Sequence, residues 1–337
     1  MAELGRMTLE ELVGATLVVG MPGLRLTAEE AAHLRAIHAG GFIPFERNFQ
    51  SPEQFNTLVA DLHTALNREL LVMVDHEGGR IIRFANGVTR FPEPLTIGKT
   101  ATPDQLRQQG AIEATELKAL GVHVNLAPCV DVLVEGSDPV IGSRSYGSDP
   151  RRVAELAAAR IQGMQAHGVA ACAKHFPGLG AVPQDPHTQL PTLRLDWATM
   201  RVLHLVPCVE AIRAGVATMM SSHVCYPRLD PTGVPATFSR RLIHTLLREE
   251  LGFHGLVLTD DLEMGALRML CPLGEAAVRA VEAGHELLLM CHSVAAQREV
   301  FDTLCAAYRS GRLASAMLER TVERVAQVRH RYSAASS

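Results

Sequence analysis

The feature that most constrains the fold is an alternation of short apolar runs with longer amphipathic segments, repeated eight times along the chain. Strands that alternate with helices in this way form parallel sheets with crossover connections. The eight evenly spaced runs favour an α/β fold, a single (β/α)8 TIM-type barrel of regular or irregular outline. An open, doubly wound sheet is the alternative, but no GxGxxG follows the first run. The predicted strands span residues 15–20, 41–45, 70–75, 122–127, 170–175, 217–223, 255–259 and 286–291.

The amphipathic segments between these runs are predicted helices, and several carry start or stop signals. Thr27 and Ser51 stand where N-caps are expected, and glycines 40, 121, 168, 215 and 284 are predicted left-handed C-caps. We find no linker, low-complexity tract or repeat, so residues 1–337 are predicted to be one catalytic domain. The predicted helices span residues 28–39, 52–67, 104–120, 150–167, 198–214, 240–251, 273–283 and 294–310, with an extra C-terminal helix at 314–332 outside the barrel.

Composition limits the partners of the chain. A net charge of −4 gives no basic face, so we predict no nucleic-acid partner. No run reaches the ~18 apolar residues of a membrane span, and the N-terminus lacks the pattern of an export signal. Seven scattered cysteines argue against a disulfide framework and favour buried thiols in a reducing compartment. We therefore predict a cytoplasmic protein with no membrane contact.

In barrels of this type, active sites form at the carboxyl ends of the strands. Polar residues occupy those positions after nearly every predicted strand, and their convergence predicts a site there. They are Arg47, Asn48, Asp75, Asn125, Asp131, Lys174, His175, His223, Asp260, Asp261 and His292.

The seventh predicted strand ends in two adjacent acids, Asp260 and Asp261. Neighbouring side chains of an extended chain face opposite sides, so only one of the two can point into the barrel mouth. We predict that Asp260 is functional, since burying an acid without a role is costly, and that Asp261 caps the next helix.

The fifth strand ends in Lys174 and His175 and is followed by a polar loop containing Asp185, Pro186 and His187. Pro186 favours an extended segment, which places Asp185 and His187 on the same side. A carboxylate that accepts from one imidazole nitrogen leaves the other free for proton transfer. The loop is therefore a candidate acid/base element, although such a tripeptide alone is more often a solvated turn.

The third strand ends in Asp75 and leads into a diglycine turn flanked by charged residues. Carboxylate and guanidinium groups suit the recognition of polar ligand groups. We predict that Asp75 and Arg83 face a ligand, while Glu77 and Arg80 form a structural ion pair.

Together these segments resemble glycoside hydrolase family 3, in particular its short bacterial β-N-acetylglucosaminidase branch. The family pattern KHFPGHG with a following D-S-H is similar to residues 174–180 and 185–187, and VDQEGGRVQRF is similar to residues 74–84. The family's SDD-L-x-M is similar to residues 259–264, and further similar segments lie at 45–49, 125–132, 141–147 and 221–227.

The resemblance implies roles for individual residues. Asp260 would be the nucleophile that forms a covalent glycosyl-enzyme, and His187, oriented by Asp185, would be the acid/base in a retaining hydrolysis. The implied substrate is a small glycan fragment with terminal β-linked N-acetylglucosamine, from peptidoglycan recycling, and no cofactor or metal is implied. Residues implied to bind the substrate are Asp75, Arg83, Arg144, Lys174, His175 and, with an undefined role, His223.

The chain departs from the family pattern at four positions. Leu179 replaces a histidine, Ala181 an acid and Pro186 a serine or threonine, and His76 stands where glutamine is usual. These changes leave the proposed nucleophile and the Asp185–His187 pair intact but remove polar groups from the loop.

Four other functions remain open at this point. Histidines 175, 187 and 223 with nearby acids could suit a zinc-dependent barrel hydrolase, but no HExxH is present. A histidine in the acid/base position repels phosphate less than a carboxylate does, which leaves a glycoside phosphorylase open. A β-glucosidase of the same family and a catalytically inactive sugar-binding barrel are the remaining alternatives.

Overall fold

Eight parallel strands close into a barrel in this computed structural model, which describes residues 7–333. Each strand pairs with the next along the chain, and β8 pairs with β1 to complete the ring. This closure confirms the predicted (β/α)8 barrel and excludes the open sheet. The strands are β1 (Leu17–Val19), β2 (Gly41–Phe42), β3 (Leu71–Val74), β4 (Val124–Asn125), β5 (Ala170–Phe176), β6 (Thr218–Ser221), β7 (Leu256–Asp261) and β8 (Leu287–Met290).

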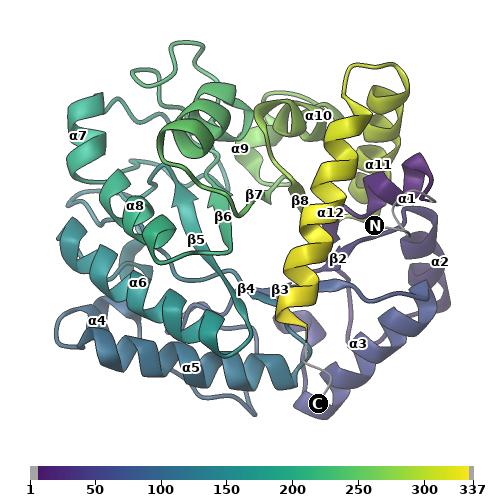
Figure 1. Cartoon of the computed structure of the whole chain (residues 1–337), viewed down its shortest axis with the longest axis horizontal. Coiled ribbons are helices and arrows are strands. Elements are labelled where there is room, and N and C mark those ends of the chain that lie inside the picture. Colours follow the sequence, from purple (N-terminus) through teal and green to yellow (C-terminus); the bar gives the residue numbers. More distant parts are fainter. Residues whose placement is uncertain (1–6, 334–337) are drawn as a thin grey trace.

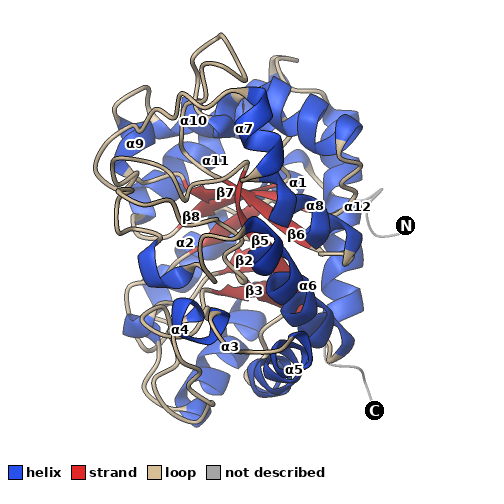
Figure 2. Ribbon diagram, turned by 90° about the vertical axis from the view of Figure 1, so that its left-hand side faces the viewer, coloured by secondary structure: helices blue, strands red, loops and turns tan. Residues whose placement is uncertain are grey.

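Helices surround the barrel on its outside (Figures 1 and 2). Every predicted helix is present within a few residues of its expected bounds, although one is divided in two. The helices are α1 (Leu9–Gly14), α2 (Ala28–Ala36), α3 (Pro52–Leu66), α4 (Pro94–Gly98), α5 (Pro103–Ala119), α6 (Pro150–Ala166), α7 (Trp197–Val202), α8 (Leu205–Arg213), α9 (Gly265–Arg268), α10 (Leu273–Ala283), α11 (Val294–Arg309) and α12 (Ser315–Tyr332), with the π-helix η5 (Arg241–Glu250) and the 3-10 turns η2 (Glu46–Asn48), η3 (Gly142–Arg144) and η4 (Ala236–Phe238).

The predicted helix 198–214 is the divided one, forming α7 and α8 with a break at Leu203. Pro207 explains the break, because a proline ring clashes with the carbonyl four residues earlier, here that of Leu203, and has no N–H to donate to it. The prediction of one continuous helix was therefore wrong.

The local signals at helix ends mostly hold. Thr27 and Ser51 accept bonds from the amides of Glu30 and Gln54. Glycines 121, 168, 215 and 284 have positive φ, but Gly40 does not, and His38 takes the left-handed conformation instead (φ 49°). At Gly40 a Cβ would lie 2.4 Å from the Ala15 carbonyl oxygen, so close packing rather than a C-cap explains this glycine.

Two apolar layers form the core, one inside the barrel and one between the strands and the helices. The inner layer includes Val325 and Tyr332 of α12. Arg324 and Arg329 of the same helix donate to carbonyls at Gly255 and Glu69, just before β7 and β3. Helix α12 therefore lies across the amino-terminal end of the barrel, as Figures 1 and 2 show.

Two expectations from composition concern the burial of the cysteines and the absence of membrane-spanning helices. All seven cysteines are free, and six are buried, but Cys271 is only partly buried, against the prediction that all would be buried. Within residues 7–333, none of the helices combines the length and the apolar composition that crossing a membrane requires. Part of the N-terminal stretch searched for an export signal, residues 1–6, lies outside the described residues.

Candidate active site

A cavity of about 380 Å³ opens at the carboxyl end of the barrel, opposite α12. Its volume is within the range of small-molecule sites. All nine site residues singled out from the sequence line this one cavity: Asp75, Arg83, Arg144, Lys174, His175, Asp185, His187, His223 and Asp260.

Asp260 projects into the cavity from an irregular strand end. The pairing of β7 with β8 shifts its register between Leu258 and Asp261, a bulge of the kind that re-aims side chains beside active sites. Asp260 lines the cavity and Asp261 does not, which agrees with the alternation expected for adjacent residues.

The surroundings of Asp260 keep it ionised. Burial raises its pKa, but His175, His223, the Asp261 amide and Lys174 lower it by more, so the pKa lies below its ordinary value. The Asp261 amide donates to Asp260 Oδ1 at 2.8 Å, and His175 Nε2 lies 4.0 Å from Oδ2. With 25% of its side chain exposed, Asp260 is a carboxylate accessible from the cavity.

Lys174 and His175 both line the cavity although they are adjacent in β5. The register of β5 against β6 shifts between Lys174 and Phe176, which interrupts the normal alternation of side chains. Lys174 Nζ lies 2.6 Å from Asp75 Oδ1 and 2.8 Å from Glu77 Oε1. Burial lowers the pKa of Lys174, but Asp75 and Glu77 raise it by more, so the ammonium form is held.

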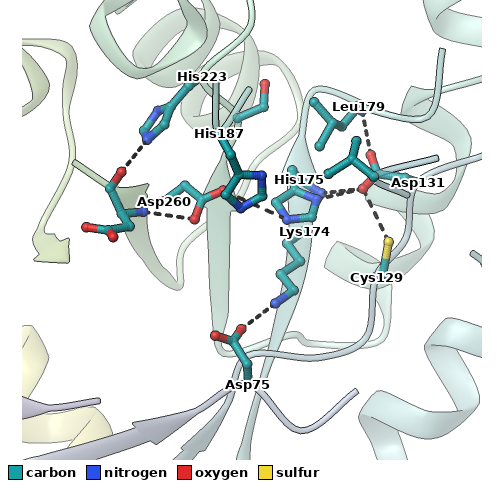
Figure 3. A network of polar contacts seen from close by, with 12 residues as sticks. Asp75, Cys129, Asp131, Lys174, His175, Leu179, His187, His223 and Asp260 are labelled. Carbon is teal, nitrogen blue, oxygen red and sulfur yellow. Dashed lines mark hydrogen bonds and ion pairs between the residues drawn. The ribbon is translucent and has the colours of Figure 1, made fainter. Parts of the chain in front are cut away.

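His175 is oriented by Asp131, as Figure 3 shows. Its Nδ1 lies 2.7 Å from Asp131 Oδ2, and its backbone amide donates to the same oxygen at 3.1 Å. Asp131 also accepts from the Leu179 amide and, at 3.3 Å, from the Cys129 thiol. Burial raises the pKa of Asp131, but His175 and these donors lower it by more, so Asp131 is an anchoring carboxylate.

Among residues 7–333, one group of side chains could bind a metal ion, with ligand atoms within 4.8 Å of one another: Cys129, Asp131 and His175. A metal there would have to displace the bonds that join them. Burial also raises the pKa of the Cys129 thiol well above its ordinary value, which disfavours the thiolate that metals bind. The donor set fits a hydrogen-bonded anchor better than a metal centre.

The Asp185–His187 pair lies at the cavity mouth, where 60% of the His187 side chain is exposed. Asp185 Oδ1 lies 2.6 Å from His187 Nδ1 and accepts from the His187 amide at 2.9 Å. The loop is joined to α9, because the amides of Gly265 and Ala266 donate to the carbonyls of His187 and Pro186. The imidazole is therefore held by its Nδ1, and its Nε2 has no hydrogen-bond partner among the described residues.

The wall of the cavity is completed by Arg83, Arg144 and His223. Arg144 pairs with Glu77, and its Nη2 lies 3.4 Å from His175 Nε2. Arg83 Nη2 lies 3.7 Å from Asp75 Oδ2. Burial lowers the pKa of His223, whose Nε2 donates to the Asp261 carbonyl at 3.0 Å, so this imidazole is neutral.

One ion pair and one helix cap expected from the sequence are wrong. Glu77 does not pair with Arg80, because the closer Arg144 and Lys174 satisfy it, and Arg80 donates to backbone carbonyls at Pro139 and Val140. Asp261 does not cap α9, which begins four residues later; its Oδ1 accepts from the amides of Glu263 and Cys291.

Six of the polar strand-end residues do not line the cavity. Their side chains bind neighbouring groups instead: Arg47 and Asn48, for example, donate to the Met21 carbonyl, and Asn125 bonds to the backbone of His76. The six are Arg47, Asn48, Asn125, Asp131, Asp261 and His292.

Sequence reasoning missed the functions of Asp131 and Glu77. Both are buried carboxylates that bind basic side chains of the cavity wall: Asp131 binds His175, and Glu77 binds Lys174 and Arg144. A buried acid needs such a partner. Both acids lie in the segments that follow apolar strands, but their partners come from other elements and cannot be read from local spacing.

Of the departures from the family pattern, Leu179 and Pro186 line the cavity, while His76 and Ala181 do not. His76 is buried and stacks on Phe84 with 5.8 Å between ring centroids. Burial lowers the pKa of His76 to about 4, so it is a neutral packing residue.

Comparison with known proteins agrees with this geometry. The model of the glycosyl hydrolase family 3 N-terminal domain matches residues 8–328. The chain is 36% identical to a beta-hexosaminidase from Nitrosomonas eutropha, over 93% of this chain and 91% of that protein.

Two solved structures are similar throughout this barrel. A family 3 beta-N-acetylglucosaminidase from Paenibacillus sp. is 38% identical with a TM-score of 0.94, covering 98% of this chain but 64% of that longer one. NagZ from Neisseria gonorrhoeae, solved with N-trifluoroacetyl-D-glucosamine, is 32% identical with a TM-score of 0.78, covering 93% of this chain and 97% of that one. The chain therefore belongs to glycoside hydrolase family 3 and is a glycoside hydrolase.

Proposed function

We propose that the protein is a retaining exo-β-N-acetylhexosaminidase that removes terminal β-linked N-acetylglucosamine. The observation that carries this proposal is the ionised, accessible Asp260 in the same cavity as the Asp185–His187 pair. A nucleophile and a separate proton-transfer group on one cavity are what a two-step displacement needs. The beta-hexosaminidase and NagZ relatives support the choice of sugar.

In the first step, the Asp260 carboxylate attacks the anomeric carbon and forms a covalent ester. His187 gives a proton to the leaving oxygen as the glycosidic bond breaks, and Asp185 stabilises the imidazolium through Nδ1. In the second step, neutral His187 takes a proton from water, which attacks the same carbon and releases Asp260. Two inversions retain the anomeric configuration.

The charged wall would hold the sugar. Lys174, Arg83 and Arg144 offer donors to hydroxyl groups, and Asp75 offers an acceptor. His175, fixed by Asp131, and neutral His223 flank the nucleophile and add directional contacts. Because these residues line one cavity of one barrel, we also propose that residues 1–337 act as one catalytic domain.

The source of the substrate and the place of reaction belong to the proposal too. The sequence resemblance favours peptidoglycan fragments hydrolysed in the cytoplasm, without a cofactor or metal.

The decisive experiment uses aryl β-glycosides of N-acetylglucosamine, glucose and xylose with the intact chain and with Asp260→Ala. We expect the N-acetylglucosaminide to be the preferred substrate and Asp260→Ala to lose turnover by several orders of magnitude. A fluorinated sugar that traps the intermediate should label Asp260. Labelling of another side chain, or release of a sugar phosphate that requires added phosphate, would contradict the proposal.

A further inference from the structure

A second cavity, of about 660 Å³, lies at the amino-terminal end of the barrel. It lies between η5, α11, α12 and the residues just before β8, and it contains none of the nine candidate active-site residues. We propose that this basal cavity binds a phosphorylated small molecule, of which a nucleoside diphosphate is the best-fitting class.

The first argument is charge. Four arginines line the basal cavity but only two carboxylates do, so cationic groups are in excess. This excess is concentrated in one concave site although the whole chain carries a net charge of −4. The four arginines are Arg240, Arg248, Arg320 and Arg324, and the carboxylates are Glu249 and Glu286.

The second argument is that the two carboxylates are already occupied. Glu286 binds Arg248, the Val257 amide and, at 2.6 Å, Arg324 Nε. Glu249 lies 3.3 Å from His244 Nδ1. Both acids are therefore partnered by groups other than Arg240 and Arg320.

Arg240 and Arg320 have no acidic partner among residues 7–333. Arg320 donates only Nε, to the Ala316 carbonyl of its own helix at 3.1 Å, which leaves the rest of its guanidinium free. Two free guanidinium groups lining one cavity suit a phosphate, which they can bind through paired charge-assisted bonds.

The third argument is the apolar part of the wall. Phe253, Leu304 and Tyr308 are buried, and Met317 is 48% exposed beside them. The Tyr308 hydroxyl makes no hydrogen bond within residues 7–333, and burial raises the pKa of Tyr308, so it remains a donor. A ligand with a weakly polar body attached to its phosphates would cover Met317, the exposed member of this wall, which inorganic phosphate would not. The cavity volume is also within the range of such ligands.

The test is calorimetric titration of the full chain with ADP, with pyrophosphate and adenosine as separate arms. We expect saturable ADP binding, weaker binding of pyrophosphate and still weaker binding of adenosine. Arg240→Ala/Arg320→Ala should weaken ADP binding about tenfold or more, since hydrogen bonds to charged groups have this magnitude. An Arg25→Ala/Arg151→Ala pair is the matched control, since both arginines are exposed, lie outside the basal cavity and have no acidic partner among residues 7–333.

Binding at the active site must be distinguished from binding at the basal cavity. Excess N-acetylglucosamine should leave the ADP titration unchanged, and both double variants should keep glycosidase activity. If the first double variant does not fold, as judged by its thermal melt, Arg320→Gln replaces it. The inference is overturned if ADP does not bind, if the control pair weakens binding equally, or if pyrophosphate binds as tightly as ADP.

Discussion

Asp260 and Asp261 are adjacent in the chain, yet their surroundings shift their pKa values in opposite directions. Asp260 faces His175 and His223, and its pKa is lowered. Asp261 faces the backbone, Glu263 and His292, whose Nε2 lies 3.4 Å from Asp261 Oδ2, and burial raises its pKa to about 7. The bulge in β7 thus places an ionised acid in the cavity while its neighbour is partly protonated near neutral pH.

The raised pKa of Asp261 predicts a stability that depends on pH. Between about pH 4 and pH 7, the unfolded carboxyl group is ionised while the folded one keeps its proton, so stability falls as pH rises. In Asp261→Asn this fall should be smaller, because the amide does not ionise and still offers Oδ1 to the Glu263 and Cys291 amides. We expect the variant to gain about 1–3 kcal/mol relative to the unchanged protein between pH 5 and pH 8.

Urea unfolding at the two pH values measures this difference. Asp302→Asn on the surface of α11 is the control, since Asp302 pairs with Arg298 and is 54% exposed. An equal pH dependence in the Asp261 variant and the unchanged protein would disprove the raised pKa.

His187 gives a second prediction at the scale of the residue. If its Nε2 protonates the leaving oxygen, His187→Ala should slow alkyl glycosides about 10²–10⁴-fold, while aryl glycosides with acidic phenols should lose far less. Steady-state kcat/KM over a series of leaving groups measures this. His330→Ala, at an exposed position of α12, should show no such dependence. An equal loss for all leaving groups would remove His187 from the acid role.

At the scale of the element, the loop that carries Asp185 and His187 depends on α9 (Gly265–Arg268), the short helix that follows Asp260. The Gly265 amide donates to the His187 carbonyl at 3.0 Å, and a Cβ at Gly265 would lie 2.6 Å from that oxygen. One contact therefore joins the two segments that carry the proposed nucleophile and the proposed acid/base.

Gly265→Ala should displace the His187 loop while leaving Asp260 in place. We expect a loss of about tenfold or more for poor leaving groups and a small effect on good ones, because only proton transfer is misaligned. Gly23→Ala is the control, since nothing lies within 4 Å of a Cβ there. Kinetics indistinguishable from those of the control would show that this contact does not position the loop.

Elements also show where sequence reasoning succeeds and fails. The apolar runs predicted all eight strands, because their burial on both faces leaves a local signal. Bulges leave none, so strand alternation alone would place only one of Lys174 and His175 in the cavity, and the placement of both came from the family resemblance. The partners of Glu77 likewise depend on β5 and η3, which lie far away in sequence. The break before Pro207, in contrast, had a visible cause that the helical pattern obscured.

At the scale of the whole molecule, the candidate active site and the packing of α12 lie at opposite ends of the barrel. The carboxyl end carries the candidate active site, while α12 covers the amino-terminal end and packs Val325 and Tyr332 into the inner core. The long loops and α12 lie on opposite sides of the strands in Figure 2. The sequence predicted α12 but not that it covers this end, since its apolar stripe does not specify what it packs against.

This separation predicts that stability and catalysis can be changed independently. Val325→Ala removes two methyl groups from a side chain that is 5% exposed and should lower the free energy of unfolding by about 1–3 kcal/mol. Because the change lies at the end of the barrel opposite Asp260, kcat and KM should stay within about twofold, in line with independent behaviour of distant sites. Gln327→Ala on the exposed side of α12 should change neither quantity.

Urea unfolding and steady-state kinetics on the same samples test both parts. A Val325→Ala enzyme that loses turnover in proportion to its stability would mean that the packing of α12 is transmitted through the strands to the catalytic end.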